Sequence, residues 1–150
     1  MAPAAELVWT NRQRTVPARQ LNLGSARCIV DRAWPLIVAA QRRGTVLPEL
    51  SEISFVLVSD ARIAAVHGTF MRDPAPTDVI TFLHGEVVIS AETARREARH
   101  RHLPLAEEIA RYAVHGLLHL AGWSDRDARA GRAMRAIQEK ILRRAARGLC

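Results

Sequence analysis

From Ala91 to its C-terminus the chain has the apolar spacing of helices, interrupted at Pro104 and Gly122. One helix is expected over Glu92–His102, a second over Leu105–Ala121, and a third, amphipathic helix after Gly122. The second helix carries an apolar stripe with the spacing of a face that packs on a core. The stripe consists of Ile109, Ala113, Leu117 and Leu120. The second half of the chain is therefore predicted to be all helical.

The first half of the chain contains the segments that favour strands. The clearest is Glu52–Ser59, a β-rich run with alternating apolar residues, and Glu6–Asn11 alternates more loosely. Asp78–Phe82 and Glu86–Ser90 are predicted as two strands joined by a tight connection at His84-Gly85. With strands in the first half and helices in the second, the chain is expected to have an α+β fold.

Two helices are expected among these strands. Ser25 is a suitable N-cap for the first, which should end near Gly44; Pro35 should either kink this helix or move its start. Asp60 is a suitable cap for the second, a short helix around Ile63. Since 150 residues suffice for one core and no linker is visible, residues 1–150 are expected to form one domain.

The chain is strongly basic, with a formal net charge of +7 and a sequence pI near 11.1. Such a charge favours an anionic partner, nucleic acid first among them. Lys140 is the single lysine, however, and a bias towards arginine can also reflect the composition of the gene. No apolar run approaches the roughly 20 residues of a membrane span, and no signal peptide is recognisable, so a cytoplasmic location is expected.

A candidate metal site lies at the end of the second predicted helix. His115 and His119 are four residues apart, so both imidazoles project from one face of the helix. Gly122 should then end the helix and let the chain reverse, which brings Asp125 towards the same face. Two histidines, one carboxylate and an open position form a catalytic zinc pattern and equally a non-heme iron pattern.

Each of these residues also has a simpler explanation. Histidine pairs at this spacing occur in helices that bind nothing, and Ser124-x-x-Asp127 has the spacing of a capping box. A capping box would place Asp125 in the first turn of the last helix, where a carboxylate favours the helix dipole. A peptidase helix would read His-Glu-x-x-His; here Gly116 occupies the position of the glutamate, so the helix provides ligands but no base.

The segment around the histidines resembles the signature of the YbeY family, bacterial metal-dependent endoribonucleases that act in ribosomal RNA maturation. The family motif, His-Gly-x-Leu-His-Leu-x-Gly-aromatic, is matched in register by His115, Gly116, Leu118, His119, Leu120, Gly122 and Trp123. Upstream, Pro76–Phe82 is similar to the family's Pro-Thr block and Gly85–Ser90 to its following strand. These blocks keep their order and spacing from roughly Ile53 to the C-terminus.

The resemblance implies a small mixed four-stranded sheet packed with about five helices. It also implies a single-strand-specific endoribonuclease with one zinc ion or another divalent transition metal. The implied reaction is hydrolysis of RNA phosphodiester bonds, in maturation of the 16S rRNA 3′ end and in ribosome quality control. Ribosomal RNA and the small ribosomal subunit are the implied partners. A non-catalytic RNA-binding metalloprotein and another zinc hydrolase, such as a peptidase, remain the alternatives.

The chain departs from the family pattern at three places. The third metal ligand of the family is a histidine, and here that position is Asp125, preceded by Ser124. The aromatic-Arg pair before the Pro-Thr block is shifted, so Arg72 stands one place late. The connection between Phe82 and Gly85 is short. With Asp125 cancelling one unit of the metal's charge, a slower hydrolase or a preference for another divalent metal is expected.

The predicted site therefore combines metal ligands and arginines. His115, His119 and Asp125 are the expected metal ligands, and Arg72 is the candidate to face a phosphate, although it could equally be a solvated loop residue. Arg95, Arg96 and Arg99 belong to the densest basic run and are candidate RNA contacts. A second row of arginines lines one side of the last helix. Either row could also be an ordinary solvated helix face.

Overall fold

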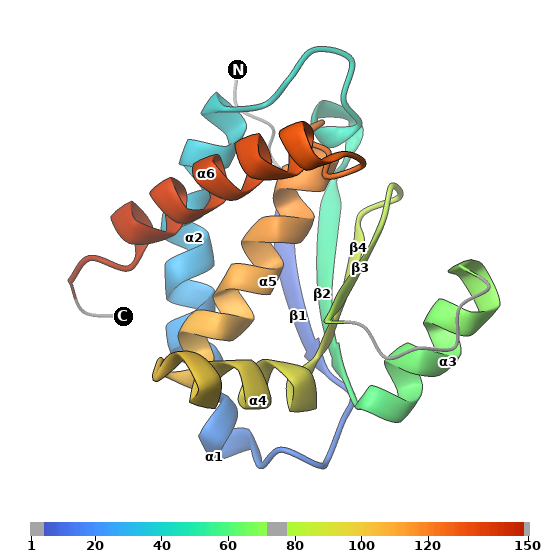
Figure 1. Ribbon diagram of the computed structural model, residues 1–150, viewed down its shortest axis with the longest axis vertical. Coiled ribbons are helices and arrows are strands. Elements are labelled where there is room, and N and C mark those ends of the chain that lie inside the picture. Colours follow the sequence, from blue (N-terminus) through green and yellow to red (C-terminus); the bar gives the residue numbers. More distant parts are fainter. Residues whose placement is uncertain (1–4, 72–77, 149–150) are drawn as a thin grey trace.

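The computed structural model describes residues 5–71 and 78–148, in which four strands form one mixed sheet (Figure 1). The strands are β1 (Glu6–Asn11), β2 (Glu52–Val58), β3 (Val79–Phe82) and β4 (Glu86–Ser90). Their order is β1-β2-β4-β3, with β1, β2 and β4 parallel and β3 antiparallel to β4. All four predicted strands are confirmed, and so is the mixed four-stranded sheet.

Helices make up most of the remaining structure. They are α1 (Ala18–Leu21), α2 (Leu23–Ala39), α3 (Asp60–Met71), α4 (Ala91–Arg101), α5 (Leu105–Leu120) and α6 (Ala128–Ala145), with a short 3-10 helix at Leu47–Glu49. The α+β fold is confirmed. Within the described residues, none of these helices combines the length and apolarity that crossing a membrane requires.

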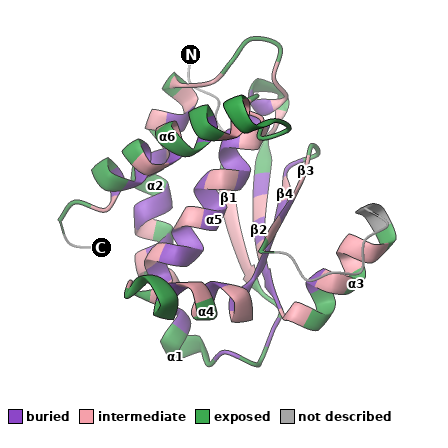
Figure 2. Ribbon diagram, in the orientation of Figure 1, coloured by how far each residue is buried: buried purple, intermediate pink, exposed green. Residues whose placement is uncertain are grey.

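The sheet separates two apolar clusters, because successive strand side chains point to opposite faces. On β2, Phe55 and Leu57 belong to the larger core, which α2, α4, α5 and α6 complete. Val58 packs on the other face in a small cluster with Ile63 of α3. Figure 1 shows α3 apart from the other helices, and Figure 2 shows α5 as the most continuously buried of them. The predicted stripe of α5 lies in the larger core.

Gly116 lets α5 approach the sheet closely. A Cβ atom at this position would lie 2.7 and 2.9 Å from the two methyl groups of Val87 on β4. Real side chains do not tolerate such distances, so only glycine allows this packing. The contact holds the C-terminal half of α5, including both histidines, against β4 and its neighbour β3.

Two predicted helix starts are wrong. The helix expected after Ser25 begins at Leu23, because Asn22 takes the left-handed conformation (φ 48°) that separates α1 from α2. The short helix around Ile63 extends to Met71, and its first turn is capped by Ser59, whose Oγ accepts a hydrogen bond from Arg62 N–H. Pro35 lies inside α2.

Candidate metal centre

His115 and His119 lie on one face of α5, with their Nε2 atoms 3.1 Å apart. The carboxylate oxygen Oδ2 of Asp125 is 3.7 Å from each of these nitrogens. Within the part of the chain that the structure describes, these three residues are the group whose donor atoms could share one metal ion, all lying within 4.8 Å of one another. The predicted convergence of the three side chains is therefore observed.

Gly122 brings Asp125 to the histidines by ending α5 with a Schellman motif. Its φ of 93° places it in the left-handed region, at the C′ position predicted from the sequence. Gly122 N–H donates to the His119 carbonyl (3.0 Å) and Trp123 N–H to the Leu118 carbonyl (2.9 Å). The reversed chain then places the Trp123 carbonyl 3.1 Å from His119 Nδ1. The same turn therefore provides the Trp123 carbonyl as a partner for His119 and places Asp125 beside both histidines.

Asp125 does not lie in the first turn of α6, and the prediction based on the capping box is wrong in this respect. The helix begins at Ala128, and its N-cap is Asp127, whose carboxylate accepts a hydrogen bond from Ala130 N–H (2.8 Å). Ser124 instead accepts one from Arg126 N–H within the preceding turn (3.2 Å). Stabilisation of the helix end therefore does not account for Asp125, which is 54 % exposed.

An oxygen atom faces the Nδ1 nitrogen of each histidine. His115 Nδ1 lies 2.8 Å from Gln138 Oε1, and His119 Nδ1 faces the Trp123 carbonyl. Since these oxygens only accept, the contacts favour the tautomer with the hydrogen on Nδ1 and a lone pair on Nε2. Burial, and then the charge of His115, lowers the pKa of His119, which favours the neutral ring.

The resulting donor set fits a divalent metal ion. Two nitrogen lone pairs 3.1 Å apart repel one another unless a cation or a proton lies between them. A tetrahedral zinc ion with bonds of about 2.0–2.1 Å separates its ligand atoms by roughly 3.3 Å, close to the spacings seen here. Partners on the far nitrogen of each ring are also the usual second sphere of metal-binding histidines.

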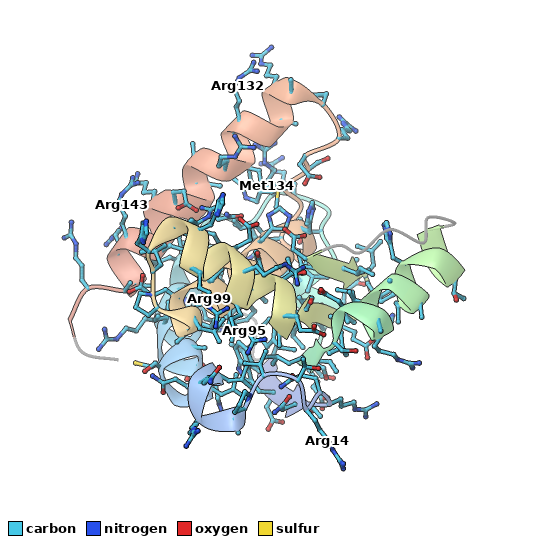
Figure 3. All side chains as sticks on the ribbon, turned by 60° about the horizontal axis from the view of Figure 1, so that its bottom comes forward. Arg14, Arg95, Arg99, Arg132, Met134 and Arg143 are labelled. Carbon is cyan, nitrogen blue, oxygen red and sulfur yellow. The ribbon has the colours of Figure 1, made fainter. Side chains whose placement is uncertain are left out.

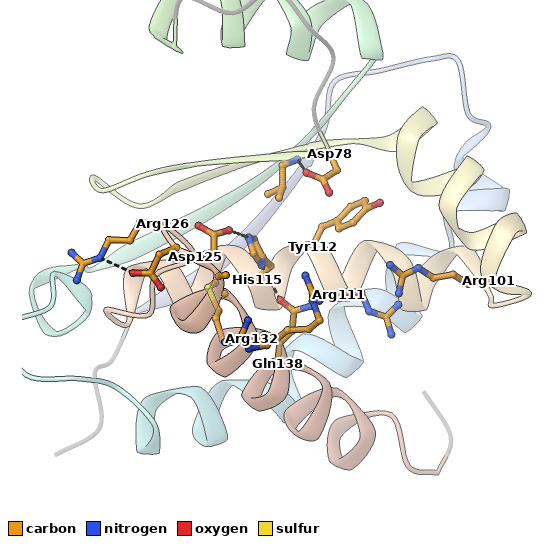
Figure 4. Close-up of a pocket in the computed structure, with 15 residues that line it drawn as sticks. Asp78, Arg101, Arg111, Tyr112, His115, Asp125, Arg126, Arg132 and Gln138 are labelled. Atoms are coloured by element: carbon orange, nitrogen blue, oxygen red, sulfur yellow. Dashed lines mark hydrogen bonds and ion pairs between the residues drawn. The ribbon is translucent and has the colours of Figure 1, made fainter.

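Two grooves meet at this centre. Both are lined by His115 and Asp125, together with Asp78 and Val79. The larger, of about 750 Å³, is rich in arginine and is hereafter the basic groove (Figure 4). Its arginines are Arg101, Arg111, Arg126, Arg132 and Arg135. The smaller, of about 580 Å³, is lined by residues of the β3–β4 hairpin and is hereafter the hairpin groove; its described lining mixes apolar, histidine and acidic side chains and has no arginine or lysine. It includes Ile80, Thr81, Leu83, Trp123, His67 and His119.

Comparison with known proteins identifies the family. The sequence profile described as endoribonuclease YbeY matches residues 36–146 of the chain. The chain belongs to the endoribonuclease YbeY family. The resemblance noted in the sequence is thereby confirmed, as are its four-stranded sheet and surrounding helices.

Individual relatives agree with this assignment. The endoribonuclease YbeY of Moorella thermoacetica is 40 % identical over 112 residues, which cover 61 % of this chain and 71 % of the relative. That of Synechococcus sp. strain CC9605 is 34 % identical over 115 residues, covering 65 % and 69 %. The solution structure of TM1509 from Thermotoga maritima has a TM-score of 0.58, with 93 % and 89 % coverage. At 21 % identity, that structure supports the fold alone.

The predicted arginines lie away from the metal centre or outside the described residues. Arg95, Arg96 and Arg99 lie on α4, and none of them lines the two grooves. Figure 3 shows Arg95 and Arg99 on this helix. Arg96 forms an ion pair with Asp60 at 2.7 Å, and Arg95 donates to the Gln20 side chain at 3.4 Å. Their contact with RNA stays a prediction. Arg72 lies outside the described residues, so its predicted role beside a phosphate also stays open.

The sequence analysis did not single out Gln138, although it contacts a predicted metal ligand. Gln138 is 8 % exposed and lies on the buried face of α6 with Met134 and Ile141. A polar residue within the apolar stripe of an amphipathic helix was the available signal, because buried polar groups need partners. Nothing local, however, connected that position to His115, which is 23 residues earlier.

Proposed function

We propose that the chain is a metal-dependent endoribonuclease that cleaves single-stranded RNA. In this proposal it acts in the cytoplasm on RNA of the small ribosomal subunit, in maturation of the 16S rRNA 3′ end and in ribosome quality control. The observation that carries the proposal is the position of the His115–His119–Asp125 group where the basic groove and the hairpin groove meet. Membership of the YbeY family supports the RNA substrate.

The three side chains would hold one divalent ion, for which zinc is proposed. Such an ion supplies a Lewis acid and lowers the pKa of a bound water. The protein's own contribution is to keep both Nε2 lone pairs directed at one point, through the Gln138 side chain and the Trp123 carbonyl. Asp125, being more exposed than the histidines, offers its carboxylate from the solvent side.

The basic groove is suited to the phosphate backbone of the substrate. Arg126, Arg132 and Arg135 line this groove from α6 and the loop before it, and all three are exposed. Guanidinium groups bind phosphate oxygens well, and neutralised phosphates release counterions, which gives affinity that falls with salt. Asp78 and Asp127 temper the positive charge locally, so backbone contact should be strongest at the outer arginines.

The apolar part of the hairpin groove supports a preference for single strands. Leu83, at the tip of the β3–β4 hairpin, is the large apolar side chain that is exposed among the described residues, at 65 %. It lines the hairpin groove together with Ile80 and Trp123. Only unstacked, unpaired bases can place their flat faces on such a surface, whereas a duplex keeps them stacked inside.

Cleavage assays with matched histidine variants test the proposal. We expect wild-type protein to cleave single-stranded ribosomal RNA fragments, to lose activity with a chelator and to regain it with zinc. His119→Ala should lower the rate at least about a hundredfold, since loss of a ligand empties the site. The control His100→Ala removes an exposed histidine on α4 and should cleave like the wild type. Chelator-resistant cleavage would contradict the proposal.

The same samples separate the two alternatives. A peptidase would degrade unfolded protein rather than RNA, but Gly116 faces Val87 of the sheet, so no base could act from that position. A non-catalytic RNA-binding protein would bind RNA without cutting it, and metal content below about half an equivalent would favour that alternative. Metal analysis of Asp125→Ala reports on the third ligand, because retained metal would exclude this role.

A further inference from the structure

We propose that Gln138 is a positioning residue that holds His115 in the tautomer with its lone pair on Nε2. The inference rests on the proposed function, in which that lone pair binds the metal. The two tautomers of a neutral imidazole are close in energy, so an outside hydrogen bond decides between them. With the hydrogen on Nε2 instead, His115 could not act as a ligand through that atom.

The position of Gln138 makes its hydrogen bond costly to lose. The residue is 8 % exposed and lies between Met134 and Ile141 on the face of α6 that packs on α5. Its Oε1 atom is 2.8 Å from His115 Nδ1. A buried amide that loses its partner is left with unsatisfied polar atoms, so the amide has a strong reason to keep this contact.

The orientation of the Gln138 amide is determined by Glu139. Gln138 Nε2 donates to the Glu139 carboxylate at 3.2 Å, which leaves Oε1 facing His115 (Figure 4). A carboxylate only accepts, so a reversed amide would place two acceptors together at Glu139. The reversed amide would also donate to His115 Nδ1 and force the hydrogen onto Nε2. Because Gln138 donates to Glu139, it accepts rather than donates in its hydrogen bond with His115.

Arg111 in turn holds Glu139. Its Nε and Nη2 atoms donate to the two carboxylate oxygens of Glu139, at 3.1 and 2.9 Å. The third nitrogen donates to Glu108, which is fully buried, at 2.8 Å. Burial opposes ionisation of Glu139, but the hydrogen bonds from Arg111 and Gln138 and the charges of Arg111 and Arg101 together outweigh it and lower the pKa of this carboxyl. Glu139 is therefore a fixed, charged acceptor.

These contacts form one chain between two helices. Arg111 and His115 are one turn apart on α5, while Gln138 and Glu139 are neighbours on α6. Arg111 holds the Glu139 carboxylate in place, and this carboxylate sets the orientation of the Gln138 amide. The amide oxygen then faces Nδ1 of the His115 ring. Such outer contacts typically change metal affinity about 10- to 100-fold when removed.

Three variants test the role of Gln138. Gln138→Met keeps the length of the side chain but removes the acceptor, and Gln138→Glu restores an acceptor. Gln20→Met is the control, because Gln20 is exposed on α1 and contacts Arg95. Two properties are measured: the ring-nitrogen NMR shifts of His115 in metal-free protein, and the Kd from titration with zinc.

We expect Gln138→Met to populate the Nε2–H tautomer of His115 and to raise the zinc Kd about 10- to 100-fold. Gln138→Glu should keep the wild-type tautomer, although it places a second carboxylate beside Glu139, and Gln20→Met should keep both the tautomer and a Kd within about threefold of the wild type. If Gln138→Met keeps the wild-type tautomer with a Kd within about twofold, the inference is overturned.

A further variant covers the case in which Gln138→Met does not fold. Glu139→Ala leaves the Gln138 amide in place but free to rotate, so it too should raise the Nε2–H population of His115; an unchanged tautomer would overturn the inference. The NMR measurement needs neither metal nor RNA. A wild type that binds no zinc, or that binds zinc and cuts no RNA, would therefore contradict the proposed function while leaving the tautomer result interpretable.

Discussion

Asp125 is the residue at which this metal centre differs from the three-histidine pattern expected from the family resemblance. Its carboxylate is 3.7 Å from both imidazole Nε2 atoms, and Asp127, not Asp125, caps α6. This geometry is consistent with the proposed role of Asp125 as the third metal ligand. A carboxylate cancels one unit of the ion's charge, whereas a third imidazole would cancel none.

Asp125→His should accordingly raise the rate of RNA cleavage at neutral pH. A more positive metal lowers the pKa of bound water further and stabilises negative charge on phosphate oxygens better. The measurement is single-turnover cleavage at full metal occupancy. Asp127→Ala is the matched control, expected to lose about 1 kcal/mol of stability and to keep its metal. An equal or lower rate for Asp125→His would count against this account of the charge.

At the scale of elements, the packing of α5 on β4 depends on a residue without a side chain. The Cβ of an alanine at position 116 would meet the Val87 methyl groups at 2.7 and 2.9 Å, and Thr81 Oγ1 at 3.1 Å. In contrast, Gly24 near the start of α2 has open space around it, because a Cβ added there would meet no heavy atom within 4 Å. The two glycines should therefore respond in opposite directions to the same substitution.

Gly116→Ala is expected to lower the free energy of unfolding by about 1–3 kcal/mol, the usual cost of overpacking. Gly24→Ala should raise it by up to about 1 kcal/mol, because alanine favours helices. Denaturant unfolding measures both. Adding Val87→Ala to the first variant should recover part of the loss, since it removes the two methyl groups in the way. If the stability losses of Gly116→Ala and Val87→Ala simply add in the double variant, the contact between these two positions is not the cause of the first loss.

The β3–β4 hairpin brings Leu83 to the hairpin groove, in the place where the connection is shorter than the family resemblance leads one to expect. Leu83→Ser should raise KM for single-stranded RNA several-fold with little change in kcat, because it removes an apolar contact with a base. His84→Ala, at the exposed neighbouring position outside the groove, is the control. Equal KM values for Leu83→Ser and the wild type would show that the Leu83 side chain does not contribute to substrate recognition.

At the scale of the whole molecule, Asp60 ties together α3, β4 and α4. Its carboxylate accepts hydrogen bonds from Ser90 (2.5 Å), Thr93 (2.7 Å) and Arg96 (2.7 Å). Burial opposes its ionisation, but these hydrogen bonds outweigh it and hold the pKa of Asp60 below its ordinary value of 3.8. The charged form of Asp60 thus stabilises the folded state.

Asp60→Asn should lower the free energy of unfolding at neutral pH by roughly 1–3 kcal/mol, the range for hydrogen bonds to a charged group. Because the folded-state pKa is depressed, the wild-type advantage is complete above the ordinary pKa and is lost as pH falls through the lowered one. Unfolding curves between about pH 7 and pH 2 measure this, with the exposed Asp31→Asn as control. A difference that does not shrink below about pH 4 would contradict the assignment.

Local patterns in the sequence were sufficient to predict the four strands, the apolar stripe of α5, the end of α5 at Gly122 and the position of His115 and His119 on one helix face. Each of these depends on residues only a few positions apart, where backbone preference and periodicity act directly. The same kind of local pattern misplaced the caps of α2, α3 and α6. At these helix starts, several residues could accept hydrogen bonds from the same backbone N–H groups. In addition, the Asp60 side chain accepts hydrogen bonds from distant residues such as Ser90 and Arg96, which no local pattern indicates.

Only the tertiary structure decided which side chains surround the metal centre. Gln138 reaches His115, and Glu139 reaches Arg111, because α6 packs across α5. The grooves combine residues of α4, α5, α6 and β3. The basic run on α4 looked equally suited to RNA, yet Arg95, Arg96 and Arg99 lie outside both grooves. Contacts between distant segments follow from how the helices pack on the sheet, and no local spacing encodes them.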